Sequence, residues 1–253
     1  AGVATGTVYV YHKGKEALLD ALYLATKKEL AESVGADALC IHLNPAMELI
    51  QPGGDRDFRG GADFFRELGG FDVPVVAKET GNGLSRRTLA QLRYVGVQHV
   101  DTSGAGGTSW VGVETRRATG AAQQLGEEYW DWGIPTGASV AALADLGLQI
   151  VATGGLRSGT DVAHALALGA TAGGLAAPVL RAYKAGGYAG TVRYLQQVIA
   201  TVRAITATEP RTAASITPAT PVVTAMGQVV FTVTLDLPAP TGGTIVGLSV
   251  RSE

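Results

Sequence analysis

The stretch VDTSGAGGT, residues 100–108, decides the expected fold. A short apolar segment runs directly into glycines and hydroxyl side chains, as a buried strand does when it ends in a binding loop. Glycine lets the backbone approach a ligand closely and take positive φ angles. Free backbone N–H groups, with the hydroxyls of Ser103 and Thr108, suit an anion such as a phosphate. A plain glycine-rich turn that closes a βα unit explains this stretch equally well, so the other strand ends must decide.

Short apolar strands alternate with helices on both sides of this stretch. The segment 109–132 between two such units is expected to be a long functional loop, because long loops in compact domains usually are. The alternation predicts a parallel sheet with crossover helices. We expect strands at 7–11, 36–44, 73–79, 99–101, 149–153 and 172–177, and helices at 15–34, 60–69, 85–95, 138–146, 158–168 and 188–206.

The ends of nearly all these strands are polar or rich in glycine. This favours a (β/α)8 TIM-barrel type, in which the βα loops build the site. An open doubly wound sheet explains the alternation but not chemistry at every strand end. Six strands precede a change of composition, so we expect a barrel incomplete at its N-terminus, or one in which other segments replace missing strands. The predicted domains are a barrel-type domain, 1–206, and a Pro/Thr-rich β tail, 207–253.

Composition excludes several classes of function. A net charge of −2 and a pI near 6.1 give no electrostatic basis for binding nucleic acid or an anionic membrane. No apolar run approaches the length of a membrane span, and residues 1–10 lack the features of a signal peptide. We therefore expect a cytoplasmic protein. The single cysteine, Cys40, excludes an internal disulfide and is expected to be a buried core thiol.

Two strand ends suggest an anionic ligand. Lys78 follows an apolar strand and could neutralise a phosphate or hold the electron-rich edge of a reduced flavin; a buried ion pair with Glu79 is the alternative. The sequence GGLR, residues 154–157, is followed one strand–helix–strand unit later by Ala176-Ala177. This spacing is typical of the phosphate site between the last two strands of a barrel. Ordinary glycine turns are the alternative.

Another strand end offers oxygen ligands. Glu48, Asp55 and Asp57 follow the second strand within ten residues of one another. Carboxylates of this kind suit Mg²⁺, which takes one or two of them together with substrate phosphates. Simple solvation is the alternative for all three. His42, on the strand end itself, could contact a diphosphate or be a satisfied core residue.

Six stretches together resemble the type 2, FMN-dependent isopentenyl diphosphate isomerase family. They run in the family's order between residues 36 and 205, and DTSGAGGTSW is the most specific of them. The matching stretches are HLNP (42–45), QPGGDRDF (51–58), VAKE (76–79), DTSGAGGTSW (101–110), WGIPTGAS (132–139) and ATGGLRSGTDVAHALALGA (152–170).

The resemblance implies a (β/α)8 barrel that binds FMN and Mg²⁺, uses NADPH to reduce the flavin, and interconverts isopentenyl and dimethylallyl diphosphate. The reaction has no net redox change. It also implies a role for each matching residue. These are flavin contacts for Lys78, Ser103 and Thr108; FMN-phosphate contacts for Gly155, Leu156, Arg157, Ala176 and Ala177; Mg²⁺ binding for Glu48; and contact with the prenyl diphosphate for His42 and Asn44.

Departures from the family pattern predict impaired turnover. The family has a glutamine immediately before the metal-binding glutamate, whereas Met47 stands here and can neither hydrogen-bond strongly nor relay a proton. The family also has two earlier barrel strands and a basic segment that grips the diphosphate, which residues 1–11 do not match. The alternative function is a non-catalytic FMN-barrel fragment or fusion that acts as a binding or scaffold module. In either case we expect a homo-oligomer.

A third possibility is an FMN oxidoreductase of the 2-hydroxy-acid oxidase kind, which shares the Gly-Gly-x-Arg strand end. Such an enzyme needs a catalytic histidine beside an arginine late in the chain. The sequence offers no such pair, so this possibility ranks last.

Overall fold

The computed structural model describes residues 15–208, and the side chains of residues 22–206. The expected strand at 7–11 and almost all of the expected tail domain lie outside these residues. The strands are β1 (Leu39–Leu43), β2 (Val75–Glu79), β3 (His99–Asp101), β4 (Gln149–Ala152) and β5 (Ala172–Gly173). The helices are α2 (Lys15–Ser33), α3 (Pro45–Ile50), α4 (Gly61–Glu67), the 3₁₀ turn η1 (Leu68–Gly70), α5 (Arg86–Tyr94), α6 (Trp110–Arg117), α7 (Ala121–Glu128), α8 (Thr136–Leu143), α9 (Gly159–Ala167) and α10 (Ala177–Thr208).

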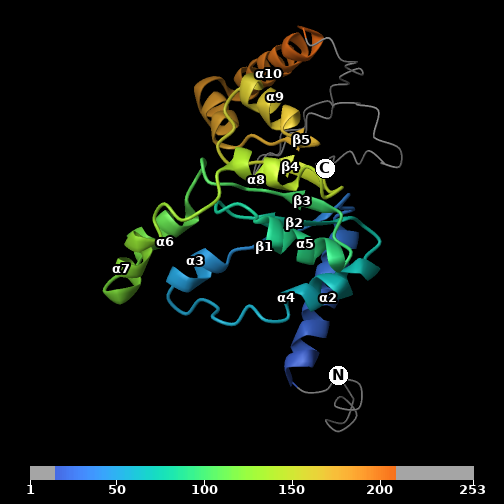
Figure 1. Cartoon of the computed structure of the whole chain (residues 1–253), viewed down its shortest axis with the longest axis vertical. Helices are drawn as coiled ribbons and strands as arrows, with labels where there is room; N and C mark the ends of the chain where they lie inside the picture. Colours follow the sequence, from blue (N-terminus) through green and yellow to red (C-terminus); the bar gives the residue numbers. More distant parts are fainter. Residues whose placement is uncertain (1–14, 209–253) are drawn as a thin grey trace.

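The described strands form one parallel sheet in the order β1-β2-β3-β4-β5. Their labels follow one another across the molecule in Figure 1. Each strand is added on the same side of the one before it. Because crossover connections are right-handed, this order places the connecting helices on one face of the sheet. A doubly wound sheet reverses direction at a switch point, and the strands within residues 15–208 show no such reversal.

The two faces of the sheet differ in chemistry. Ile41, Ala77, Val100 and Ile150 occupy one register row and are buried in the main core under the helices. Residues one position along each strand point to the other face, because side chains alternate. Beside Val76 and Val151, that second face carries polar groups such as Lys78 and Asp101, whereas a sheet covered by helices on both sides is expected to be aliphatic on both.

Segment 109–132 is not a loop, which corrects the prediction. It folds into α6 and α7, which lie beside α3 at one side of the molecule (Figure 1). Ser109 caps α6 by accepting from the N–H of Gly112 at 3.0 Å. Gly126 of α7 packs against Thr115 so closely that a Cβ at position 126 would lie 2.1 Å from its hydroxyl. α7 was not predicted because Gly126 is its one buried residue, so its sequence lacks the apolar stripe that indicates a helix.

Two further predictions need correction. The sixth expected strand, 172–177, is only two residues long, and α10 begins at Ala177 rather than at residue 188. Its backbone is non-helical at Gly186 and Gly187, and only the part after this break matches the expected helix. Cys40 is exposed, not buried, because it lies on the polar face of β1, which pairs with one strand only among the described residues.

Candidate functional site

A polar row crosses the second face of the sheet near the carboxyl ends of its strands. The register aligns His42 of β1 with Lys78 of β2, Lys78 with Asp101 of β3, and Asp101 with Val151 of β4. Residues paired in register on neighbouring parallel strands share a face. The fold therefore brings together two predicted site residues, His42 and Lys78, and adds Asp101, to which the sequence analysis gave no individual role.

Lys78 and Glu79 do not pair with each other. They are consecutive in β2, so their side chains point to opposite faces. The Lys78 ammonium donates to the backbone carbonyl of Glu79 at 2.6 Å. The buried carboxylate of Glu79 instead accepts from the N–H groups of Thr80, Gly81 and Asn82 at 2.5–3.0 Å. The alternative of a buried ion pair is therefore wrong, and Lys78 is free to act on a ligand at the polar face.

Asp101 links the ends of β3 and β4. Its Oδ1 accepts from the backbone N–H of Ser103 at 3.0 Å and, in a short hydrogen bond, from the hydroxyl of Thr153. Burial raises the pKa of Asp101, whereas the Thr153 hydrogen bond, the Lys78 ammonium and the Ser103 N–H act in the opposite direction. Ser103 has φ +35°, the one positive φ outside glycine among residues 15–208. This half-buried carboxyl therefore stabilises an otherwise unfavourable turn.

The glycine loops after β3 and β4 pack against each other, backbone to backbone. A Cβ on Gly154 would lie 2.1 Å from the carbonyl oxygen of Gly104, and one on Gly155 would lie 2.4 Å from that of Gly106. Both Gly154 and Gly155 have positive φ angles, +102° and +88°. The Thr136 hydroxyl donates to the Gly154 carbonyl at 2.5 Å. Part of the glycine content of these motifs is therefore required by this contact between loops, which no local sequence pattern indicates.

Backbone donors remain available at the predicted phosphate site. The N–H groups of Gly155 and Leu156 have no acceptor within the described part of the chain. α10 begins at Ala177, after β5, which pairs with β4. The N-terminus of a helix attracts anions through its free N–H groups and its dipole. The loop and the helix start therefore offer donors of the kind that an anion such as a phosphate requires.

Arg157 is held at the same loop, but by protein groups. Its guanidinium donates to the Gly106 carbonyl at 3.0 Å, and its own carbonyl accepts from the Tyr194 hydroxyl at 2.7 Å. The N–H of Arg157 donates to Asp161, which also completes a capping box with Ser158 at the start of α9. Arg157 therefore fastens the β3 loop, the β4 loop and α10 together while its exposed side chain stays near the site.

Glu48 lies on α3, after β1, and its carboxylate is already held. Oε1 accepts from the Asn44 side-chain amide at 2.8 Å, and Oε2 accepts from the backbone N–H of Asp55 at 3.0 Å. Asn44 and Glu48 thus lie together, and Met47 precedes Glu48 on the first turns of the same helix. No group of three or more potential metal ligands occurs among residues 15–208. A Mg²⁺ at Glu48 would need further oxygen ligands from a bound diphosphate.

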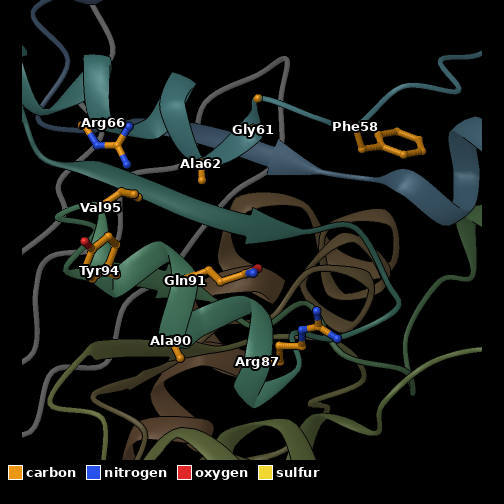
Figure 2. A pocket seen from close by; sticks show the side chains of 10 residues that line it. Phe58, Gly61, Ala62, Arg66, Arg87, Ala90, Gln91, Tyr94 and Val95 are labelled. Atoms are coloured by element: carbon orange, nitrogen blue, oxygen red, sulfur yellow. The ribbon is translucent and has the colours of Figure 1, made fainter.

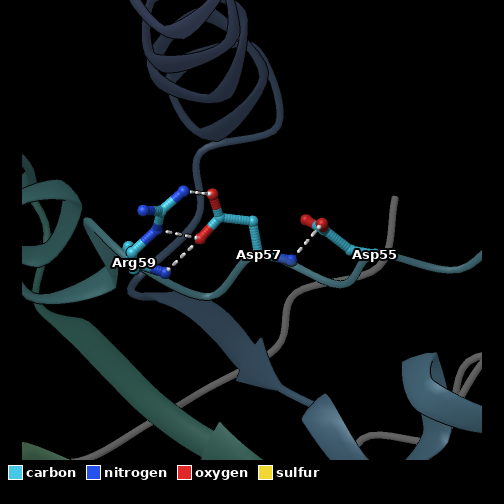
Figure 3. A network of polar contacts seen from close by, with 3 residues as sticks. All are labelled: Asp55, Asp57 and Arg59. Carbon is cyan, nitrogen blue, oxygen red and sulfur yellow. Dashed lines mark hydrogen bonds and ion pairs between the residues drawn. The ribbon is translucent and has the colours of Figure 1, made fainter.

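Asp55 and Asp57 stabilise their own loop (Figure 3). Asp55 accepts from the N–H of Asp57 at 3.0 Å. Asp57 accepts from the backbone N–H and the guanidinium of Arg59, at 2.5–3.1 Å. That ion pair lowers the pKa of Asp57. These two carboxylates therefore stabilise turns of their own loop. The structure does not make them further metal ligands beside Glu48.

A separate groove lies between α4 and α5, on the helical side of the sheet. It has a volume of about 560 Å³ and is lined by Phe58, Arg66, Arg87 and Tyr94 among others. Figure 2 shows Arg66 and Tyr94 at one end, and Phe58 and Arg87 at the other. None of the predicted site residues lines it. The candidate site is therefore the polar face and the strand-end loops.

Comparison with known proteins shows which proteins the chain is similar to. The family model described as FMN-dependent dehydrogenase matches residues 87–206, which contain both glycine loops and the start of α10. The solved structures that match are distant. The GMP reductase of Trypanosoma brucei is 19% identical and has a TM-score of 0.49; the match covers 76% of this chain and 39% of that chain.

The particular relatives are isopentenyl-diphosphate delta-isomerases. The chain is 48% identical to that of Methanothermobacter thermautotrophicus over 153 residues, 60% of this chain and 43% of the relative. It is 43% identical to that of Thermococcus onnurineus over 175 residues, 68% and 47% of the two chains. The chain thus spans less than half the length of these relatives. The resemblance stated from the motifs is confirmed over this shared part.

Proposed function

We propose that this chain is the FMN-binding part of a type 2 isopentenyl diphosphate isomerase, which interconverts isopentenyl and dimethylallyl diphosphate. The identity of 41–48% to proteins named isopentenyl-diphosphate delta-isomerase carries the proposal. The FMN-dependent family model over 87–206 supports the flavin. The consecutive order of five parallel strands supports a (β/α)8 barrel, because a sheet that grows in one direction with its helices on one face can close on its other face.

In this proposal different strand ends bind different parts of FMN. Gly155, Leu156 and the first turn of α10 hold its phosphate through backbone N–H groups, with Arg157 close by. Lys78, Ser103 and Thr108 contact the flavin and its ribityl chain. Reduced FMN, formed with NADPH, supplies the proton transfer of the allylic shift. The ammonium of Lys78 stabilises negative charge on the reduced cofactor.

The prenyl diphosphate binds beside β1 and α3. His42 and Asn44 would contact its phosphates, and Glu48 would help to hold a Mg²⁺ that neutralises their charge. The hydrogen bond from Asn44 to Glu48 keeps these two residues together. Met47 takes the place of the family's glutamine and offers no proton or strong hydrogen bond near the reacting carbons. We therefore expect slow turnover.

The test begins with cofactor binding. The purified protein is mixed with FMN, and bound flavin is measured by its absorbance and by quenching of its fluorescence. Isomerisation of isopentenyl diphosphate is then followed by proton NMR with FMN, NADPH and Mg²⁺. We expect bound FMN and slow isomerisation that requires both NADPH and Mg²⁺. Failure to bind FMN would overturn the proposal.

The variant Met47→Gln restores the missing amide, and Met47→Leu is its matched control. The first should raise the isomerisation rate at least tenfold, and the second should leave it at the wild-type level. If FMN binds but Met47→Gln shows no isomerisation, the non-catalytic binding module becomes the better description. Wild-type rates typical of full-length relatives would show that Met47 does not impair turnover.

A further inference from the structure

Asp101 lies at the junction of three strands. It is the last residue of β3, and the register sets it beside Lys78 of β2 and Val151 of β4. Its side chain is on the polar face, where the FMN site is proposed. Lys78 and Ser103, two of the residues expected to contact the flavin, both interact with it.

One oxygen of Asp101 fixes backbone geometry. Oδ1 accepts both the Ser103 N–H and the Thr153 hydroxyl. Ser103 is held at φ +35°, a conformation that is unfavourable for a residue with a Cβ. Thr153 immediately precedes the glycines of the phosphate loop. One oxygen atom therefore links the two strand ends from which the glycine loops begin.

The other oxygen is available for charge interactions. Oδ2 accepts no hydrogen bond from the part of the chain that the structure describes. Lys78, paired in register on the same face, is a cation that interacts with this carboxylate. The Lys78 ammonium has its one protein hydrogen bond within the described residues to the Glu79 carbonyl, at the end of its own strand. A negative charge beside it draws the ammonium toward β3.

We propose that Asp101 is a positioning residue, which holds the Ser103 turn through its hydrogen bonds and orients the Lys78 ammonium toward the flavin through its charge. The proposal rests on the FMN site proposed above. The two roles can be separated, because asparagine keeps an acceptor oxygen for Ser103 and Thr153 but carries no charge. Alanine removes both.

The experiment measures the dissociation constants of oxidised and reduced FMN for the wild type, Asp101→Asn and Asp101→Ala. Asp145→Asn is the matched control, since Asp145 is an exposed carboxylate paired with Arg86, before β4 at the opposite end of the strands. Asp101→Ala should weaken binding of oxidised FMN at least tenfold, and Asp101→Asn by less than threefold. Asp101→Asn should also lower the preference for reduced over oxidised FMN about tenfold relative to the wild type, because the Lys78 ammonium would no longer be oriented toward the flavin. For a two-electron couple this equals about 30 mV in the potential of bound FMN.

Each outcome decides the proposal. Wild-type-like binding of FMN by Asp101→Ala would overturn it, and so would an unchanged preference for reduced FMN in Asp101→Asn. If Asp101→Ala does not fold, Asp101→Asn still decides through that preference, which a purely structural residue would not change. If the wild type itself binds no FMN, the proposed function fails as well. If the wild type binds FMN but the variants lack the changes expected of them, only the role of Asp101 is overturned.

Discussion

The contact between the two glycine loops can be tested by adding a single methyl group. In Gly154→Ala the new Cβ would lie 2.1 Å from the Gly104 carbonyl oxygen and 2.5 Å from its nitrogen. Both are backbone atoms, so no side chain can turn away to relieve the contact. Gly96→Ala is a close control: Gly96 has φ +100° against +102° for Gly154, and a Cβ there would meet nothing within 4 Å.

The two substitutions share the backbone penalty and differ in the contact. The positive φ costs about 1–2 kcal/mol in each variant. Relief of the clash at residue 154 must separate the loops. That weakens the 2.9 Å bond from the Gly104 N–H to Thr153 and the 2.5 Å bond from Thr136 to the Gly154 carbonyl. At about 1 kcal/mol for each hydrogen bond, Gly154→Ala should lose about 3–4 kcal/mol of folding stability and Gly96→Ala about 1–2.

Thermal unfolding followed by circular dichroism measures the difference. For a protein of this size, 1 kcal/mol shifts Tm by about 2–4 °C. Gly154→Ala should therefore lower Tm by about 6–16 °C, and Gly96→Ala by about 2–8 °C, with Gly154→Ala the larger in a paired measurement. FMN affinity should fall in Gly154→Ala only. Equal losses of Tm in the two variants would refute the argument that these loops require glycine for contact with each other.

Three further predictions concern other parts of the chain. Ser158→Ala removes the hydroxyl that accepts from the Asp161 N–H, so the free energy of unfolding should fall by about 1 kcal/mol, as urea titration would show; no loss would mean that the cap is dispensable. Burial lowers the pKa of His99 below 6.5, so the unfolded state binds more protons and stability should decline as pH falls below about 6.5; His99→Gln should reduce that decline in pH-dependent melts. Arg157→Lys keeps the charge but loses the planar guanidinium that donates to Gly106; FMN affinity should fall several-fold, and fluorescence titration that finds it unchanged would contradict this.

The elements with strong local signals could be predicted from the sequence. Apolar runs ending in polar groups predicted β2 at Val75–Glu79 and β3 at His99–Asp101 within two residues. The helix expected at 85–95 is α5, which begins at Arg86, and the Ser85 side chain caps it by accepting from the Thr88 N–H. The order of the strands in the sheet follows from topology, which single strands do not encode, so the choice between barrel type and doubly wound sheet needed the structure.

The details of the site were less accessible. The motif around Asp101 was recognised as a whole, but the role of Asp101 depends on Thr153, some fifty residues later, and no local pattern signals that pairing. The exposure of Cys40 was mispredicted because an apolar strand was assumed to be covered on both faces. For Asp55 and Asp57 the sequence could not distinguish metal ligands from turn-forming residues, because Arg59 turns toward Asp57 only in the folded loop.

The consecutive order of the strands also has a consequence for how the chain folds. Each strand pairs with the one synthesised just before it, so every new pairing closes a loop whose other end is already in place. The largest closure joins His99 to Gln149 and spans the α6–α7 excursion. Closure entropy grows only slowly with loop length. The β3–β4 closure therefore costs only slightly more than the β1–β2 closure, so each described strand can join the sheet in turn as the chain leaves the ribosome.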